Sequence, residues 1–334
     1  MAPRQKDWLP WVALFSLALL LLLVIAGASY QAIAWRLEAG RFIHPGHVVR
    51  VGEFRLNLYC IGQGRPTVVL EAGLADSLDS WRRVQPEIAR FSRVCSYDRA
   101  GYGYSELGPM PRTSIHIALE LHEALGKAGE KPPYLLVGHS FGGFNVRVFN
   151  GKYPDEVAGL VLVDATQEDQ YNLLPRAWSE LGTAMRRRAN RQAFWAPVYV
   201  GLGIARLQLL LHSQKISPLL LQSKYLKARA SEFDNIEVSA NQARTADHIR
   251  DKPLVVLTAG KAVDDSLKAA LGEQEGRAYE KTWVRDLQLR LTRLSRRGNQ
   301  VIVSDSGHDM PTDRPDAIVR AVRQLCATAP ALKP

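Results

Sequence analysis

The chain has 334 residues, enough for one large α/β domain or two small ones, and 46% of them are hydrophobic, which supplies a sizeable core. A formal net charge of +10 invites a nucleic-acid-binding function, but the basic residues are scattered and no nucleic-acid-binding module is recognisable, which argues against that class. The three cysteines contain no C-x-x-C pair, which argues against a structural zinc site.

The N-terminal stretch predicts a membrane anchor. Leu9–Gly27 is almost continuously apolar and has no charged residue. As a helix it would be about 28 Å long, enough to cross the hydrocarbon layer. A cleaved signal peptide is the main alternative, because Ala26-Gly27-Ala28 resembles a cleavage site. We favour an uncleaved anchor that comprises residues 1–36, with a transmembrane helix at about residues 9–30.

The orientation of this anchor is left open by the charges around it. Basic residues precede and follow the apolar stretch, so the excess of Lys and Arg does not assign one side to the cytoplasm. We prefer the orientation that places the rest of the chain outside the cytoplasm.

After the anchor, short apolar runs bounded by turns predict strands, and helical patterns lie between them. The predicted strands are Val48–Phe54, Arg55–Cys60, Thr67–Leu70, Val94–Tyr97, Tyr134–Val137, Gly159–Val163, Pro253–Thr258 and Gln300–Val303. The predicted helices include Ser80–Phe91, a helix capped by Thr113 or Ser114, Phe144–Lys152, Trp283–Arg296 and Pro315–Ala327. This alternation predicts βαβ crossovers and a mainly parallel sheet in one domain over residues 48–330.

Residues 168–249 interrupt the alternation and predict a helical cap inserted between two core strands. The insertion carries an arginine cluster, Arg186-Arg187-Arg188 and Arg191, and the apolar run Val198–Leu211. The arginines suit a solvated helix face or contact with anionic lipid headgroups. The apolar stretches suit either a membrane surface or the lining of an apolar pocket, and we favour the pocket.

A nucleophilic serine is the clearest functional prediction. A predicted strand ends at Gly138-His139-Ser140-Phe141-Gly142, which matches G-x-S-x-G, and a predicted helix follows. This context predicts a nucleophile elbow, a sharp strand-to-helix turn that exposes Ser140 on strained backbone. Side chains at Gly138 and Gly142 would crowd the turn. We assign no chemistry to His139.

Four motifs follow predicted strands in a fixed order. They are Glu71-Ala72-Gly73-Leu74, Asp98–Ser105, Gly138–Gly143 and Ser306-Gly307-His308. With these motifs the chain from about Val48 onward resembles the α/β-hydrolase family, and more narrowly membrane-anchored members of its esterase/lipase-like branch. The resemblance implies an α/β fold with an eight-stranded, mostly parallel sheet flanked by helices and carrying a helical cap insertion, here preceded by an N-terminal transmembrane helix.

Carried over to this sequence, the resemblance implies a Ser-His-Asp triad. Ser140 is the expected nucleophile and His308 the general base. The backbone N–H groups of Leu74 and Phe141 are the expected oxyanion donors. Asp98 and Arg99 are expected to brace the glycine turn that follows them. No cofactor or metal is implied.

The acidic member of the triad has two candidate positions. The family usually places it after the seventh strand, where Asp264 and Asp265 lie, and some members place it after the sixth, at Asp164. We favour Asp164, because it ends an apolar strand abruptly and its side chain must emerge at the edge of the sheet.

The same resemblance makes the strands of Cys60 and Cys95 neighbours. A disulfide and two buried thiols both remain open, and the disulfide would require an oxidising compartment.

The leading function is hydrolysis of carboxylic esters, most of all apolar ones, through an acyl-enzyme intermediate. Other reactions on the same triad are an alternative: amide, peptide or C–C bond hydrolysis, or acyl transfer. A second alternative is a ligand-binding receptor or pseudoenzyme with low turnover. The expected partners are a small ester-type substrate and the lipid bilayer, with no nucleic acid.

Overall fold

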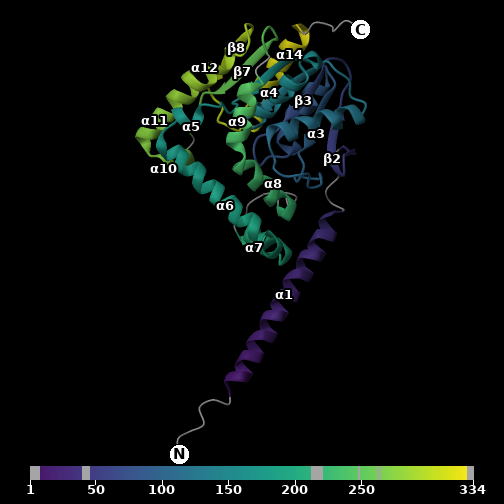
Figure 1. Cartoon of the computed structure of the whole chain (residues 1–334), viewed down its shortest axis with the longest axis vertical. Coiled ribbons are helices and arrows are strands. Elements are labelled where there is room, and N and C mark those ends of the chain that lie inside the picture. The colour runs from purple at the N-terminus through teal and green to yellow at the C-terminus, as the bar shows by residue number, and fades with distance from the viewer. Residues whose placement is uncertain are drawn as a thin grey trace, which may run out of the picture.

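Apolar strands and amphipathic helices build one eight-stranded sheet with helices on both faces (Figure 1). The computed structural model describes residues 8–39, 46–211, 221–246, 249–261, 263 and 265–328. The strands are β1 His47–Val51, β2 Phe54–Ile61, β3 Thr67–Glu71, β4 Val94–Asp98, β5 Tyr134–His139, β6 Val157–Val163, β7 Leu254–Ala259 and β8 Gly298–Val303.

The sheet is mostly parallel, in the order β1-β2-β4-β3-β5-β6-β7-β8. Strand β2 runs antiparallel to both of its neighbours, and every other pair from β4 to β8 is parallel. The predicted fold class is therefore confirmed. Because parallel strands are joined by crossovers, their carboxyl ends meet at one edge of the sheet, and the segments that follow β3, β5, β6 and β8 lie there together.

Successive residues of the central strands enter two different cores. In β5, Leu136 packs into a core with the helices of one face, whereas Leu135 and Val137 pack into the core on the other face. The central strands β5, β6 and β7 are buried at every position, as strands covered on both faces must be. A rigid, twice-covered sheet thus carries the segments at its carboxyl edge.

The helices outside the cap agree with the predicted helices, with local differences. The helices outside the cap are α2 Gln85–Ala89, α3 Ser114–Lys127, α4 Gly142–Lys152, α10 Asp265–Leu271, α11 Glu273–Lys281, α12 Gln288–Thr292, α13 Met310–Asp313 and α14 Pro315–Thr328, with 3₁₀ turns η1 Leu78–Trp81 and η2 Pro154–Glu156 and a π-helical segment Thr282–Leu287. The predicted helix Ser80–Phe91 is two short pieces, because a proline starts the second.

Between β6 and β7 the chain forms a set of cap helices. They are α5 Gln170–Leu173, α6 Arg176–Gly201, α7 Ile204–Leu211, α8 Ser223–Asp234 and α9 Ile236–Thr245. Helix α6 runs obliquely away from the sheet, from α10 and α11 at one end toward α7 at the other (Figure 1). The cap helices lie on the side of the sheet from which α1 projects.

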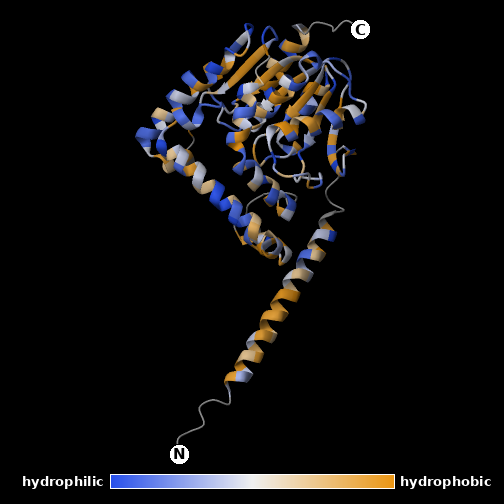
Figure 2. Cartoon of the chain, viewed as in Figure 1, coloured by the Kyte–Doolittle hydropathy of each residue, from blue (hydrophilic) through white to orange (hydrophobic). Residues whose placement is uncertain are grey.

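The N-terminal helix α1, Leu9–Ala39, projects away from the sheet and ends far from it (Figure 1). Within Leu9–Leu37, the most apolar window has a mean hydropathy of 2.7 and none of it is buried, so the helix is long and apolar enough to cross a membrane. Figure 2 shows that most of this helix is apolar and that its hydrophilic residues lie toward its ends.

A disulfide joins the two strands at the antiparallel side of the sheet. Cys60 of β2 is directly opposite Cys95 of β4, with their Cα atoms 4.1 Å apart, and their sulfurs are bonded. Of the two states left open by the sequence, the structure has the disulfide. Such bonds persist in oxidising compartments and are rare in the cytosol.

Replacing both cysteines, in Cys60→Ser with Cys95→Ser, is expected to lower the free energy of unfolding. The crosslink joins residues that are 35 positions apart. Without it the unfolded chain has more conformational entropy, which lowers the free energy of unfolding by about 3 to 4 kcal/mol. Urea unfolding in mild detergent measures the change, with Cys326→Ser as control because Cys326 is a free thiol. An unchanged midpoint in the double variant would contradict a stabilising crosslink.

Candidate active site

Ser140 lies in the tight turn between β5 and α4, with a backbone φ of 51°. A positive φ is strained for a residue other than glycine, and such strain clusters at functional sites. Two hydrogen bonds hold the turn: the Ser140 N–H donates to the Val163 carbonyl (3.0 Å), and the Gly143 N–H donates to the Ser140 carbonyl (2.9 Å). The turn fixes the serine at the carboxyl edge of the sheet.

Two glycines make this turn possible. A Cβ added at Gly138 would lie 2.6 Å from the carbonyl oxygen of Gly142. A Cβ added at Gly142 would lie 2.6 Å from the carbonyl oxygen of Glu71. Both contacts are with backbone that cannot move aside, so the turn requires glycine at both positions, as the sequence predicts.

A chain of hydrogen bonds connects Ser140 to a buried carboxylate. His308, after β8, has its Nε2 atom 3.0 Å from Ser140 Oγ and its Nδ1 atom 2.6 Å from Asp164 Oδ2. Asp164 follows β6, also with a positive φ, of 39°. The structure thus brings together three of the residues singled out in the sequence, although His308 is 144 residues from Asp164 and 168 residues from Ser140.

Asp164 has a full set of donors. Its Oδ1 atom accepts hydrogen bonds from Trp283 Nε1 (2.9 Å) and from the Ala259 N–H (3.0 Å), while Oδ2 faces His308. The carboxylate is 1% exposed. A buried carboxylate is stable when donors compensate for lost water, and these donors also fix the plane in which it meets the imidazole.

The side chains of the two alternative acids lie outside what the structure describes. Asp264 lies outside the described residues, and Asp265 is the first residue of α10, with a side chain outside the described part of the chain. Among described carboxylates, Asp164 is the one hydrogen-bonded to His308 Nδ1.

The loop after β3 runs against the serine. A Cβ added at Gly73 would lie 3.4 Å from the Cβ of Ser140, so the next residue, Leu74, is close to the nucleophile. Phe141 directly follows Ser140 in the turn. Among the residues that the structure describes, neither the Leu74 N–H nor the Phe141 N–H has a hydrogen-bond acceptor. Within the described part of the chain, both are unpaired backbone donors beside Ser140.

Arg99 holds this loop in place, which differs from its predicted role in the glycine turn. The buried guanidinium donates to the carbonyls of Ala72 (2.8 Å) and Gly73 (2.7 Å). It also pairs with Glu71 of β3 and with Glu232 of the cap helix α8, each at 2.9 Å. Because the arginine lies between β3 and the cap, it braces the loop that carries Leu74.

Asp98 does brace the glycine turn. Its carboxylate accepts hydrogen bonds from the Tyr104 N–H (3.0 Å) and from Asn57 Nδ2 (3.0 Å). It also accepts one from the Leu78 N–H. A Cβ at Gly103, whose φ is 44°, would lie 2.3 Å from Asp98 Oδ2. The glycine is therefore needed for close approach to the carboxylate.

His139 has a role that the sequence did not indicate. Its buried ring donates a hydrogen bond from Nε2 to the His308 carbonyl oxygen (2.8 Å). Burial and the nearby His308 lower the pKa of His139 to about 4, so the ring is neutral at physiological pH. The sequence also did not indicate that Trp283 is a residue of this site. The elbow motif accepts many residues at position 139, and Trp283 reads as an ordinary helix residue.

Two further carboxylates lie near His308. Burial and the charge of Asp309 raise the pKa of Asp76 to about 6. Burial lowers the pKa of His308, but the hydrogen bond and charge of Asp164, with the charges of Asp76 and Asp309, outweigh it. The net result is a pKa of His308 above its ordinary value.

An eight-stranded, mostly parallel sheet with a glycine-flanked serine turn after β5 and a histidine after β8 is the arrangement of an α/β-hydrolase. A comparison with known proteins agrees. The family model described as alpha/beta hydrolase fold matches residues 66–251, more than half of the chain. The chain belongs to this family, as the four motifs indicated.

Several relatives resemble the chain over large parts of its length. An uncharacterized protein of Bacillus subtilis is 31% identical over 163 residues, which are 48% of this chain and 50% of the relative. An AB hydrolase superfamily protein of Gibberella zeae is 25% identical over 285 residues, 78% of this chain and 86% of the relative. The first of these matches thus covers about half of the relative's length.

Among solved structures, a thermophilic esterase from Thermogutta terrifontis superposes with a TM-score of 0.57 at 20% identity. The match covers 85% of this chain and 99% of the esterase. At this identity the likeness shows the fold alone.

Proposed function

We propose that this protein is a serine hydrolase that cleaves carboxylic esters through an acyl-enzyme intermediate. The observation that carries the proposal is the hydrogen-bonded chain from Ser140 through His308 to Asp164, beside two unpartnered backbone N–H groups. These are the components that acyl transfer needs: a nucleophile, a base held in one tautomer, and donors for the oxyanion.

In the proposed acylation, Ser140 Oγ attacks the ester carbonyl carbon while its proton passes to His308 Nε2. The carbonyl oxygen becomes an oxyanion that accepts hydrogen bonds from the N–H groups of Leu74 and Phe141. As the tetrahedral intermediate collapses, the ester C–O bond breaks, and His308 gives its proton to the leaving alkoxide. Asp164 stabilises the imidazolium between the two proton transfers.

Deacylation repeats these steps with water in place of the serine. His308 removes a proton from the water, and the resulting hydroxyl attacks the acyl carbon. The same backbone donors stabilise the second oxyanion, and the proton returns to Ser140 Oγ as the acid product leaves. No group outside this chain and water is required.

A buried aromatic cluster supports the base. The ring of Trp283 lies 6.4 Å from that of His308, edge to face, and stacks on Tyr279. Tyr279 in turn contacts Trp178 of α6. Trp283 and Tyr279 are buried, so these rings form an apolar core that supports His308 and Asp164 from behind.

We also propose that α1 anchors the protein in a membrane, with the hydrolase domain outside the cytoplasm. Length and apolarity support the anchor. The disulfide between Cys60 and Cys95 supports the orientation, since it requires an oxidising compartment.

The proposed function is tested on the full chain in mild detergent. A fluorophosphonate probe reports an activated serine, and p-nitrophenyl esters of rising chain length report turnover. Stoichiometric labelling with multiple turnover on at least one ester supports an ester hydrolase. Labelling without ester turnover would favour a reaction on another acyl compound, or a receptor that turns over little. No labelling of folded protein would contradict the assembled triad.

The acidic limb of the pH profile is expected to lie above the ordinary pKa of histidine, about 6.5. His308 acts as a base only when neutral, so kcat/KM falls as pH falls through its pKa, which is raised. Because the charge of Asp76 contributes to that raised pKa, Asp76→Asn moves the limb to lower pH. Initial rates across pH measure the position of the limb in the parent protein and in the variant. If Asp76→Asn does not move the limb, the electrostatic contribution of Asp76 is contradicted.

A further inference from the structure

The far end of the cap exposes apolar side chains to solvent. We define the cap tip as the exposed apolar residues in the second half of α6 and in the whole of α7. They are Phe194, Trp195, Val198, Ile204, Leu207, Leu210 and Leu211. Phe194 is 75% exposed and Leu211 is 72% exposed. The sequence favoured pocket lining for this stretch, whereas among the described residues these side chains are 39% to 75% exposed. A cluster of exposed apolar side chains marks an interaction surface.

The cap tip lies directly beside α1. Arg206 of α7 donates from Nε to the side-chain oxygen of Gln31 (2.7 Å). A Cβ added at Gly27 would lie 2.7 Å from the carbonyl oxygen of Leu202, so the two backbones are in close contact there. Figure 1 shows α7 next to the end of α1 nearest the sheet.

The position of these contacts along α1 sets the height of the cap tip. Leu9–Gly27, about 28 Å as a helix, is enough to fill the hydrocarbon layer. Gly27 and Gln31 therefore lie where α1 leaves that layer, at the level of the headgroups. A surface that contacts α1 at this height lies against the membrane interface.

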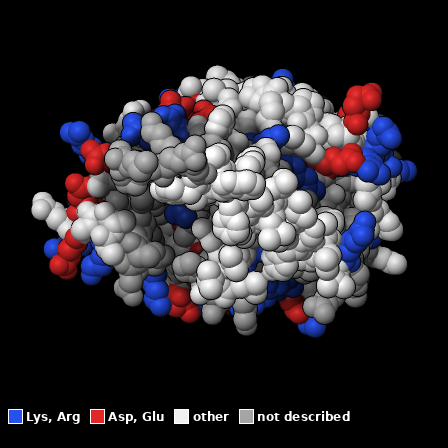
Figure 3. All heavy atoms as spheres, turned by 90° about the horizontal axis from the view of Figure 1, so that it is seen from below, with Lys and Arg blue, Asp and Glu red and all other residues white. Residues whose placement is uncertain are grey.

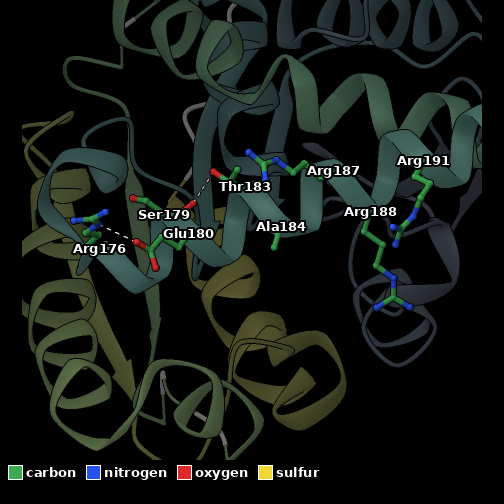
Figure 4. Close-up of a pocket in the computed structure, with 8 residues that line it drawn as sticks. All are labelled: Arg176, Ser179, Glu180, Thr183, Ala184, Arg187, Arg188 and Arg191. Atoms are coloured by element: carbon green, nitrogen blue, oxygen red, sulfur yellow. Dashed lines mark hydrogen bonds and ion pairs between the residues drawn. The ribbon is translucent and has the colours of Figure 1, made fainter.

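Basic side chains precede the apolar ones along α6. Arg187, Arg188 and Arg191 belong to the lining of an open depression of about 600 Å³ on this helix, and Arg188 and Arg191 project to the same side (Figure 4). No ion pair joins these three arginines to a carboxylate in the described part of the chain. Because α6 rises 1.5 Å per residue, Arg191 lies about 6 Å from Trp195 along the helix axis.

Figure 3 views the molecule from the side to which α1 projects, so the uncharged atoms at the centre of the view include those of α1, and charged side chains of both signs lie around them. Apolar side chains at the centre with basic side chains around them are typical of surfaces that enter the headgroup region of a bilayer. Each arginine near an anionic surface contributes about 1 kcal/mol of attraction.

We propose that the cap tip is a second membrane contact, which enters the surface of the bilayer that α1 crosses, with Arg187, Arg188 and Arg191 binding anionic lipid phosphates. This inference rests on the proposed anchor and is independent of the proposed chemistry. A second copy of the chain is the competing occupant, but two such tips would bring their unpaired arginines together. Taken together with the proposed ester hydrolysis, the membrane contact indicates an ester dissolved in the bilayer as substrate, because the cap is then held at the surface that contains it.

The test uses the full chain in nanodiscs, with Cys326→Ser and one new cysteine labelled with an environment-sensitive fluorophore. Phe194→Cys and Leu210→Cys report on the cap tip. Leu20→Cys reports on α1, and Ile302→Cys, on the exposed side of β8, is the matched surface control. Lipids that carry a doxyl quencher high in the acyl chain measure the contact of each label with the bilayer.

We expect at least about twofold stronger quenching at positions 194 and 210 than at position 302, since apolar side chains of such helices reach the acyl boundary. Quenching at position 20 but not at 194 or 210 would overturn the second contact while keeping the anchor. A blue shift at 194 and 210 without quenching would mean that protein covers the tip, which also overturns it. No quenching at any position would remove the anchor and this inference together.

The role of the arginines is tested in the same nanodiscs by adding phosphatidylglycerol. Quenching at position 194 is expected to rise with the anionic lipid, and the rise is expected to be lost in the triple variant Arg187→Gln, Arg188→Gln, Arg191→Gln. Arg320→Gln, on the exposed side of α14, is the matched control and keeps the rise. An equal rise in the triple variant would overturn the phosphate contact.

Discussion

Ser140→Ala is expected to abolish fluorophosphonate labelling and to lower kcat on the best ester by about ten-thousand-fold or more. The substitution removes the oxygen that lies 3.0 Å from His308 Nε2 and leaves no atom to form the acyl-enzyme. The backbone donors of Leu74 and Phe141 remain, so a small rate above that of water persists. Labelling followed by gel fluorescence, and steady-state rates on p-nitrophenyl esters, measure the two losses.

The matched control for this substitution is Ser304→Ala, which removes an exposed hydroxyl just after β8. It is expected to retain both labelling and turnover. The fold of Ser140→Ala is checked by its thermal unfolding midpoint, which should change little, because alanine tolerates the turn no worse than serine. Labelling that persists in a folded Ser140→Ala variant would place the reactive serine elsewhere and overturn the assignment.

Asp164→Asn has the second largest expected effect, a loss of about ten-thousand-fold in kcat with KM little changed. Oδ1 can still accept from Trp283 and from the Ala259 N–H, so the new amide keeps its orientation. That orientation presents an NH₂ group, in place of Oδ2, to His308. The imidazole must then accept at Nδ1 and carry its proton on Nε2, which is the wrong tautomer to take a proton from Ser140.

The pH profile adds a second readout for this variant. The carboxylate of Asp164 raises the pKa of His308, so its removal moves the acidic limb of any residual activity to lower pH. Asp264→Asn and Asp265→Asn are the comparison variants, and both are expected to keep normal activity. If one of them loses activity while Asp164→Asn retains it, the acid is the residue after β7 and the proposed triad is wrong.

Local patterns explain why the sheet and the turn that carries Ser140 were predictable. The buried strands are continuous apolar runs, and their ends are marked by glycines or by an abrupt carboxylate, as at Asp164. Ser140 is enclosed by glycines that the turn requires, and His308 follows a strand through a glycine. Each of these signals fits within about ten residues of sequence.

The supporting contacts were not predictable, because no local pattern encodes them. Trp283 meets Asp164 across 119 residues, and it does so from a π-helical segment where the sequence shows an ordinary helix. Arg99 reaches Glu232 across 133 residues, so its role could not be read from the glycine turn beside it. His139 donates a hydrogen bond to a backbone carbonyl, and no pattern of side chains in the sequence predicts such a contact.

The cap tip illustrates a further limit. Periodicity showed that the stretch before Leu211 has an apolar side, but a helix face looks the same in sequence whether protein, lipid or water covers it. Only the arrangement of α6, α7 and α1 in space decides which. The same apolar pattern that favours a pocket in an isolated domain lies at a membrane surface under the proposed second contact.

The buried pairing of Arg99 with Glu232 sets a rule for protein engineering. Exchanging cap insertions between family members is an obvious way to change substrate range, because the cap begins after β6 and ends before β7. In this chain a foreign cap without a carboxylate at the position of Glu232 would leave a guanidinium under-compensated in the interior, beside the carbonyls of Ala72 and Gly73. A chimaera must therefore inherit α8 together with the loop after β3 as one module.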